Sequence, residues 1–283
     1  MEKAKSGDPR VEEDWKNCGE LGKGGFGVVY KQIQKTTGHY RAVKTIDKRL
    51  PNLDYSRELH AMAILAKVCY PSLFVEFLGW FEEPETLYIA MEYLEEGDLR
   101  NHSRTPLSQE TVRTISEQLL QGLEVMHQEG IAHRDIKPEN IFVVSMSPVW
   151  VKLGDFGISK RIPAEATTTF HTQVSTPVYS APEVLGLDSH SETSDYTNSV
   201  DIWSLGCVVY ELLVGKRLFI SESQVFRYYL GGWQFLEDEL KGLSPPMNNV
   251  GILFLKSMLT IQPENRPTAV GALGHEWLMG LES

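Results

Sequence analysis

His133-Arg134-Asp135-Ile136-Lys137-Pro138-Glu139-Asn140 is the stretch that decides the fold, and Asp155-Phe156-Gly157 follows it fifteen residues after Asn140. A long helix with one buried face is predicted just before it, because apolar residues recur every three or four positions up to Gly130. These apolar residues are Val112, Ile115, Leu119, Leu123 and Met126. The candidate catalytic side chains therefore follow directly after a helix that ends at a glycine.

A glycine-rich loop lies far upstream, in Leu21-Gly22-Lys23-Gly24-Gly25-Phe26-Gly27-Val28. Glycine lets backbone amides approach phosphate oxygens closely, so such a loop can cover a nucleotide. By itself the spacing is also compatible with a plain turn. A dinucleotide-binding oxidoreductase shares it, but its loop should open a helix. Here Val28-Val29-Tyr30 predicts a strand instead, which disfavours that reading.

Lys44 lies in a second predicted strand, Ala42 to Ile46, where Ala42, Lys44 and Ile46 face one way. A turn at Thr36-Thr37-Gly38 separates it from the first strand, and further strands are predicted for Phe74 to Phe81 and Leu87 to Tyr93. A lysine beside a small alanine leaves room for a flat base and directs an ammonium group toward phosphates. Glu58 lies on the helix predicted for Tyr55 to Lys67 and could pair with Lys44. The alternatives are a solvated lysine and an exposed Arg57/Glu58 pair.

Taken together, these motifs in this order resemble the eukaryotic protein kinases, over about Gly19 to Leu278. The resemblance implies an α+β, bilobal fold with a small β-rich N-lobe carrying one main helix and a larger, mainly helical C-lobe. It implies a flanking segment at 1–14, the N-lobe and hinge at 15–94, and the C-lobe at 95–283, with the catalytic domain spanning 15–278. Glu95-Glu96-Gly97-Asp98, a polar breaker, is the predicted junction.

The same resemblance implies transfer of the γ-phosphate of ATP, with Mg²⁺, to serine or threonine hydroxyls of proteins. Asp135 would be the catalytic base, Lys137 would offset charge at the γ-phosphate, and Lys44 would bind the phosphates. Asn140 and Asp155 would bind Mg²⁺. A lysine at position 137 is typical of the serine/threonine branch. The surrounding sequence resembles calcium/calmodulin-dependent or checkpoint-type kinases.

The nucleotide site implied by the resemblance combines the glycine loop, the strand with Lys44 and the hinge. Met91 would guard the back of the adenine pocket, and the backbone from Glu92 to Leu94 would bind the base. The full predicted set is Leu21, Gly22, Lys23, Gly24, Gly25, Phe26, Gly27, Val28, Val29, Ala42, Lys44, Glu58, Met91, Glu92, Leu94, Asp98, Asn140 and Asp155.

Later motifs agree with the family. Thr176-Pro177-Val178-Tyr179-Ser180-Ala181-Pro182-Glu183 resembles the segment that receives the substrate, with Thr176 bonded to Asp135 and Lys137. Asp201-Ile202-Trp203-Ser204-Leu205-Gly206 resembles the start of a central helix, and Arg266 resembles the arginine that pairs with Glu183. These last residues are expected to support the structure.

Regulation is predicted at the segment from Ile158 to Ser175, which offers Thr167, Thr168, Thr169 and Thr172. Thr172 lies four residues before Thr176, the spacing at which relatives carry an activating phosphate. An upstream kinase or autophosphorylation would supply that phosphate, and Arg134 could pair with it. The alternative is a polar loop whose threonines are merely exposed.

Protein substrates with a basic residue upstream of the target are expected, because Asp98 and Glu139 occupy positions where relatives bind an arginine. Alternatively, Asp98 contacts only ribose and Glu139 only solvent. A second function class is a pseudokinase that binds nucleotide as a scaffold. The presence of Lys44, Asp135, Asn140 and Asp155 disfavours that class.

The composition narrows the partners and the cellular location expected for this protein. The 27 Lys and Arg against 38 Asp and Glu give a net charge of −11, which argues against nucleic acid and anionic membrane as partners. Three cysteines, Cys18, Cys69 and Cys207, are expected to be free thiols. Neither a signal-peptide core nor a membrane span is recognised, so an intracellular protein, cytoplasmic or nuclear, is expected.

The chain departs from the family pattern in three places. Ser175 replaces the usual glycine before Thr176-Pro177, and Lys44 and Glu58 are separated by fewer residues than in many relatives. The stretch from Ser145 to Trp150 is expected to lengthen the turn before Asp155.

Overall fold

The computed structural model describes residues 14–24, 27–49, 55–68, 70–156, 177–187 and 198–280. The chain divides into two compact units. Unit 1 comprises Met1–Pro51 with Glu76–Tyr93, and unit 2 comprises Asn52–Val75 with Leu94–Ser283. The predicted domain ranges, 15–94 and 95–283, stay a prediction.

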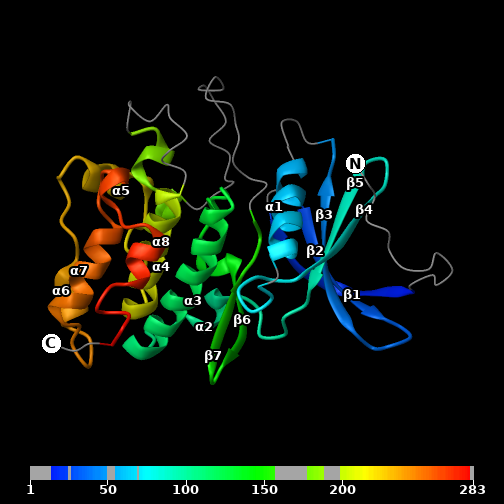
Figure 1. The fold of residues 1–283 in the computed structure, drawn as a ribbon, viewed down its shortest axis with the longest axis horizontal. Helices are drawn as coiled ribbons and strands as arrows, with labels where there is room; N and C mark the ends of the chain where they lie inside the picture. Colours follow the sequence, from blue (N-terminus) through cyan, green and yellow to red (C-terminus); the bar gives the residue numbers. More distant parts are fainter. Residues whose placement is uncertain are drawn as a thin grey trace. The chain divides into compact units, whose positions relative to one another are not determined.

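Unit 1 is built on a five-stranded antiparallel sheet (Figure 1). Its strands are β1 (Trp15–Gly24), β2 (Gly27–Gln34), β3 (Tyr40–Asp47), β4 (Phe77–Glu82) and β5 (Thr86–Glu92), in the spatial order β1-β2-β3-β5-β4. The predicted turn between β2 and β3 is confirmed. Gly38 adopts a φ of 76°, a left-handed conformation that glycine adopts without steric cost, and its amide donates to the Gln34 carbonyl.

Strand β3 is the centre of this sheet, because it pairs with β2 on one side and β5 on the other. β-branched residues suit a pleated, half-buried surface, and Val43 and Ile46 are almost fully buried. Leu87 and Ile89 of β5 are buried beside them. Lys44 is therefore anchored in the most regular part of the sheet.

Unit 2 is mainly helical. Its helices are α1 (Tyr55–Val68), α2 (Leu99–His102), α3 (Gln109–Gln128), α4 (Ser199–Val214), α5 (Glu222–Tyr229), α6 (Glu237–Lys241), α7 (Asn249–Met258) and α8 (Ala269–Leu273). Its strands are β6 (Ile141–Met146) and β7 (Val149–Leu153), and single 3₁₀ turns occur at η1 (Pro138–Asn140), η2 (Pro177–Tyr179), η3 (Pro182–Leu185) and η5 (Pro263–Asn265). The prediction of an α+β chain with a β-rich part and a mainly helical part is confirmed.

Helix α3 confirms its prediction from hydrophobic spacing. It begins after Ser108, whose hydroxyl accepts from the Thr111 amide at 3.1 Å and so satisfies one of the free N–H groups of the first turn. It ends before Gly130, which has a φ of 69°. The predicted apolar face is buried, and α3 packs against α4 and β7.

Helix α4 is the core of unit 2, since all of its residues after Ser199 are buried. Trp203 stacks on Phe219 with the ring centroids 5.9 Å apart. The helix is buried on every face because other elements surround it. Within the described ranges, no helix combines the length and apolar character that crossing a bilayer requires.

Two sequence expectations are wrong in detail. The predicted strand from Phe74 starts only at Phe77, because Phe74 forms an isolated parallel bridge with Leu153 instead. The stretch from Ser145 to Trp150 is not an enlarged turn, because most of it belongs to the β6-β7 hairpin. The indole N–H of Trp150 donates to the Ser72 carbonyl at 2.8 Å and fixes one end of that hairpin.

Candidate active site

Asp201, a fully buried residue on α4, binds the backbone of the segment between α3 and β6. Its carboxylate accepts from the backbone amide of His133 at 2.8 Å and from that of Arg134 at 2.7 Å. Arg134 has a φ of 65°, a conformation that costs a non-glycine residue roughly 1–3 kcal/mol. The two charge-assisted hydrogen bonds stabilise this strained backbone and so position the next residue, Asp135.

Two of the predicted site residues, Lys137 and Asn140, contact one carboxylate oxygen of a third, Asp135. The ammonium nitrogen of Lys137 lies 2.7 Å from Oδ2 of Asp135. The amide nitrogen of Asn140 donates to the same Oδ2 at 2.9 Å and to the backbone oxygen of Asp135 at 2.8 Å. The side chains of Asp135 and Lys137 are only 13% and 17% exposed. The carboxylate is therefore oriented from two sides and keeps Oδ1 for other contacts.

Asp155 is positioned by the residue before it. The Gly154 amide donates to the Asn140 carbonyl at 3.0 Å, and Nε2 of His133 donates to the Gly154 carbonyl at 3.1 Å. A Cβ at position 154 would lie 2.8 Å from a side-chain atom of Val75, so this close packing needs glycine. Asp155 itself has a φ of 55°. The backbone hydrogen bond between Gly154 and Asn140 thus links the two residues of the predicted metal-binding pair, Asn140 and Asp155.

The donor set of this pair fits Mg²⁺, a hard cation that prefers oxygen ligands. Because both Asn140 amide hydrogens are directed at Asp135, the amide oxygen is the atom left for a cation. Within the described part of the chain, no group of three or more His, Cys, Asp or Glu side chains could bind a metal by itself. The remaining ligands would have to come from phosphate oxygens and water.

The glycine-loop residues lie on β1 and β2 of unit 1. Gly24 pairs with Gly27 where the two strands meet, and Val29 pairs with Lys44 across β2 and β3. A Cβ on Gly27 would come within 1.6 Å of the Thr45 carbonyl oxygen, so only glycine fits. Gly22 and Lys23 belong to β1, and Leu21 there is exposed. Gly25 and Phe26 lie outside the described residues.

The candidate adenine residues meet on β3 and β5. Ala42 pairs in register with Met91, and Lys44 pairs with Ile89. Ala42 and Lys44 are both buried, with 7% and 9% exposure. Glu92 accepts from the Glu76 amide at 3.1 Å, and Leu94 is the first residue of unit 2 after the sheet.

Several predicted contacts lie beyond what the structure describes. Glu58 is on α1, as predicted, but its side chain lies outside the described residues, so its pairing with Lys44 stays a prediction. Thr172 and Thr176 also lie outside them. The same holds for Thr167, Thr168 and Thr169.

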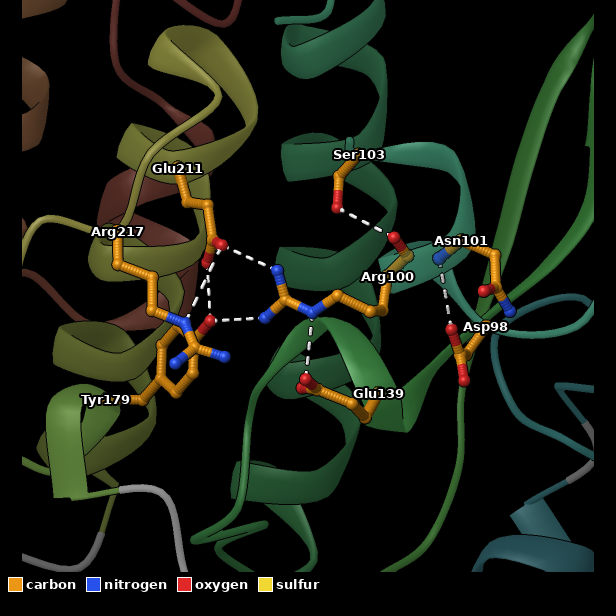
Figure 2. Close-up of polar contacts among 8 residues, drawn as sticks. All are labelled: Asp98, Arg100, Asn101, Ser103, Glu139, Tyr179, Glu211 and Arg217. Atoms are coloured by element: carbon orange, nitrogen blue, oxygen red, sulfur yellow. Dashed lines mark hydrogen bonds and ion pairs between the residues drawn. The ribbon is translucent and has the colours of Figure 1, made fainter. Parts of the chain in front are cut away.

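The two carboxylates expected to meet a substrate's basic residue have partners within the chain. Asp98 caps α2 by accepting from the Asn101 amide at 3.2 Å. Burial raises the pKa of Asp98, and the negative charge of Glu139 adds to that rise. Oε1 of Glu139 accepts from Nε of Arg100 at 2.8 Å (Figure 2). The expectation that Glu139 meets only solvent is therefore wrong.

Arg100, Tyr179 and Glu211 are the residues near the site that sequence reasoning missed. Arg100 also donates to Glu211 and to the Tyr179 hydroxyl, each at 2.6 Å. Glu211 is 111 residues away along the chain, a distance over which spacing carries no signal. Glu183 and Arg266, by contrast, form the predicted pair, with two hydrogen bonds of 2.6 and 2.9 Å, and that prediction is confirmed.

Comparison with known proteins agrees with this geometry. A family model described as the protein kinase domain matches residues 15–278. The chain is 35% identical over 272 residues to the serine/threonine-protein kinase RAD53 of Saccharomyces cerevisiae, covering 91% of this chain and 32% of that protein. It is 33% identical over 265 residues to a probable myosin light chain kinase of Dictyostelium discoideum, covering 92% of this chain and 82% of that protein.

A solved structure resembles the fold as well. The crystal structure of Rad53 1-466 in complex with AMP-PNP matches with a TM-score of 0.76 and 33% identity, covering 94% of this chain and 65% of that chain. The chain belongs to the protein kinase domain family, and the predicted class, a kinase domain of the serine/threonine type with the bilobal kinase fold, is confirmed. The chain spans about a third of the length of RAD53.

Proposed function

We propose that this chain transfers the γ-phosphate of ATP to serine or threonine hydroxyls of other proteins, with Asp135 as the catalytic base. One observation carries the proposal: Lys137 and Asn140 both contact Oδ2 of Asp135, within 2.9 Å. Such an arrangement orients the carboxylate, as phosphoryl transfer requires positioning and charge neutralisation above all.

In this mechanism, Oδ1 of Asp135 accepts the hydrogen bond of the acceptor hydroxyl. The hydroxyl oxygen forms a bond to the γ-phosphorus while the bond from that phosphorus to the bridging oxygen of ADP breaks. Asp135 takes the hydroxyl proton, and Lys137 offsets the negative charge that develops on the transferred phosphoryl group.

The nucleotide and metal assignments belong to the same proposal. Lys44, Ala42 and the glycine loop would bind ATP, while Asn140 and Asp155 would bind Mg²⁺. When bound, Mg²⁺ neutralises phosphate charge. The assignment is supported by the AMP-PNP bound to Rad53, a relative at 33% identity, and by the oxygen donors of Asn140 and Asp155.

The decisive experiment compares phosphate transfer by wild type and by an Asp135→Asn variant. The variant should lose at least about 10²-fold in kcat, the usual contribution of a general base. Asp238→Asn, an exposed residue with the same change of group, is the matched control and should keep full activity. A wild type without transfer would instead support the pseudokinase alternative, and an active Asp135→Asn variant would remove Asp135 as the base.

Regulation by phosphorylation of Thr172, by an upstream kinase or by the chain itself, is a further part of the proposal. Its support is the position of Arg134 beside the catalytic base, where a phosphate could pair with the guanidinium. Thr172→Ala should lower the activity of the phosphorylated enzyme, whereas Thr167→Ala should not. Equal activity of both variants would remove the assignment.

We also propose protein substrates with a basic residue upstream of the target. Support comes from Asp98 and Glu139, two partly exposed carboxylates close enough for the charge of one to raise the pKa of the other. A peptide array without any basic preference would contradict the substrate assignment.

An intracellular setting, cytoplasmic or nuclear, is supported by the free thiols of Cys18 and Cys207.

A further inference from the structure

Arg100 is at the centre of a charged cluster that the reaction described above does not use. The cluster consists of Arg100, Glu139, Tyr179 and Glu211, and Figure 2 shows the Arg100 guanidinium between the two carboxylates. Its three nitrogen atoms each have a separate partner: Nε donates to Glu139, Nη1 to Glu211 and Nη2 to the Tyr179 hydroxyl. The Tyr179 hydroxyl in turn donates to Glu211.

The solvent exposure of the charged side chains in the cluster increases from Glu211 to Arg100 to Glu139. The side chain of Glu211 is 6% exposed, that of Arg100 is 28% exposed and that of Glu139 is 35% exposed. Burial alone would lower the pKa of Arg100, but its hydrogen bonds to Glu211 and Glu139 raise it overall. The second guanidinium nearby, that of Arg217, is 3.9 Å from Glu211 and therefore makes only a loose contact.

The position of the cluster connects it with the acceptor side of the proposed reaction. Glu139 lies in η1, between Asp135 and Asn140. Tyr179 ends η2, which begins at Pro177 and lies within the segment predicted to receive the substrate. Two of the four cluster residues thus come from the two loops that would contact an acceptor peptide.

We propose that Arg100 is a specificity-determining residue, whose guanidinium occupies the place at which a basic side chain of the substrate would otherwise pair with Glu139 and Glu211. The inference rests on the proposed kinase function and refines its substrate preference. With Arg100 present, Glu139 and Glu211 already share one guanidinium, so Glu139 adds only weakly to Asp98 and the basic preference of wild type is modest. Without Arg100, two carboxylates in a partly buried site would attract a substrate's arginine or lysine.

The experiment measures kcat/KM for a set of serine peptides that carry arginine or alanine at each of the six positions before the target. The quantity compared is the arginine-to-alanine ratio at the most sensitive position. In Arg100→Gln this ratio should rise about tenfold over wild type, a change of about 1.4 kcal/mol. Arg104→Gln removes an equal charge from an exposed neighbour and should leave the ratio unchanged.

A second variant distinguishes neutralisation of charge from structural support. Arg100→Gln/Glu211→Gln removes one charge of each sign, so its ratio should return toward the wild-type value. Glu211→Gln alone leaves Arg100 paired with the single carboxylate of Glu139, so the cluster loses its excess negative charge and the ratio should fall below wild type. This variant tests the same charge balance if Arg100→Gln does not fold. The gain in Arg100→Gln should also decrease at high ionic strength.

The measurements distinguish failure of the proposed kinase function from failure of the role proposed for Arg100. If wild type phosphorylates no peptide, the proposed function fails and this inference with it. If wild type is active but the ratio is the same in wild type, Arg100→Gln and Glu211→Gln, the proposed function stands and Arg100 has only a structural role.

Discussion

An Asp201→Asn variant is expected to lose about 3 kcal/mol of unfolding free energy and most of its phosphate transfer. The change conserves shape and removes one negative charge from a residue without solvent exposure. Asp201 uses both carboxylate oxygens: Oδ1 accepts from the Arg134 amide, and Oδ2 accepts from the His133 amide and contacts Nε2 of His127. The variant therefore tests whether this carboxylate organises the catalytic segment.

The expected loss of unfolding free energy follows from the number of hydrogen-bond acceptors that the side chain at position 201 keeps. Asparagine has a single side-chain oxygen, so one of the two buried backbone N–H groups loses its acceptor, at a cost of about 1–3 kcal/mol. The bond that survives changes from a charge-assisted to a neutral one, which is roughly half as strong and costs about 1 kcal/mol more. Relaxation of the left-handed backbone at Arg134 would then displace Asp135, and a displacement of about 1 Å can lower kcat by about 10²-fold.

Urea denaturation and steady-state kinetics with one peptide substrate measure the two effects. Asp238→Asn, on the exposed surface of α6, makes the same chemical change and should stay within about 0.5 kcal/mol of wild type with normal kcat. An Asp201→Asn variant that unfolds within about 1 kcal/mol of wild type and keeps its kcat would refute the reasoning.

Two further predictions concern packing and a buried ion pair. Gly27→Ala should lose about 2 kcal/mol of stability in urea denaturation, because its Cβ would lie 1.6 Å from a carbonyl oxygen of the neighbouring strand. Gly22→Ala, with nothing within 4 Å of its Cβ, should change stability little, and equal losses in both variants would contradict this. Glu183→Gln should cost about 3–5 kcal/mol, because it leaves the guanidinium of Arg266, which is 0% exposed, without its carboxylate. The double variant Glu183→Leu/Arg266→Met should recover much of that loss, and a loss below about 1 kcal/mol in the single variant would count against the buried pair.

Helices and turns were predictable from the sequence where the residues of that one element carry the pattern. Helix α3 follows from its apolar spacing and from Gly130, because one helical face must be buried and a glycine readily ends the helix. The turn at Gly38 follows for a similar reason. The strand expected from Phe74 was placed too early, because a residue's apolar character does not tell which strand it will pair with.

The sequence by itself determined which chemical groups are available and in what order: Lys44, Asp135, Asn140 and Asp155, with the motifs that identify the family. Those assignments depend on neighbours a few residues apart, for which chain connectivity already limits the geometry. Only the tertiary structure decided which charged groups surround Arg100, whereas the pairing of Glu183 with Arg266 already followed from the family motifs. Arg100 meets Glu139 and Glu211 at sequence separations of 39 and 111 residues, and these contacts exist only because packed elements bring distant segments within hydrogen-bonding distance.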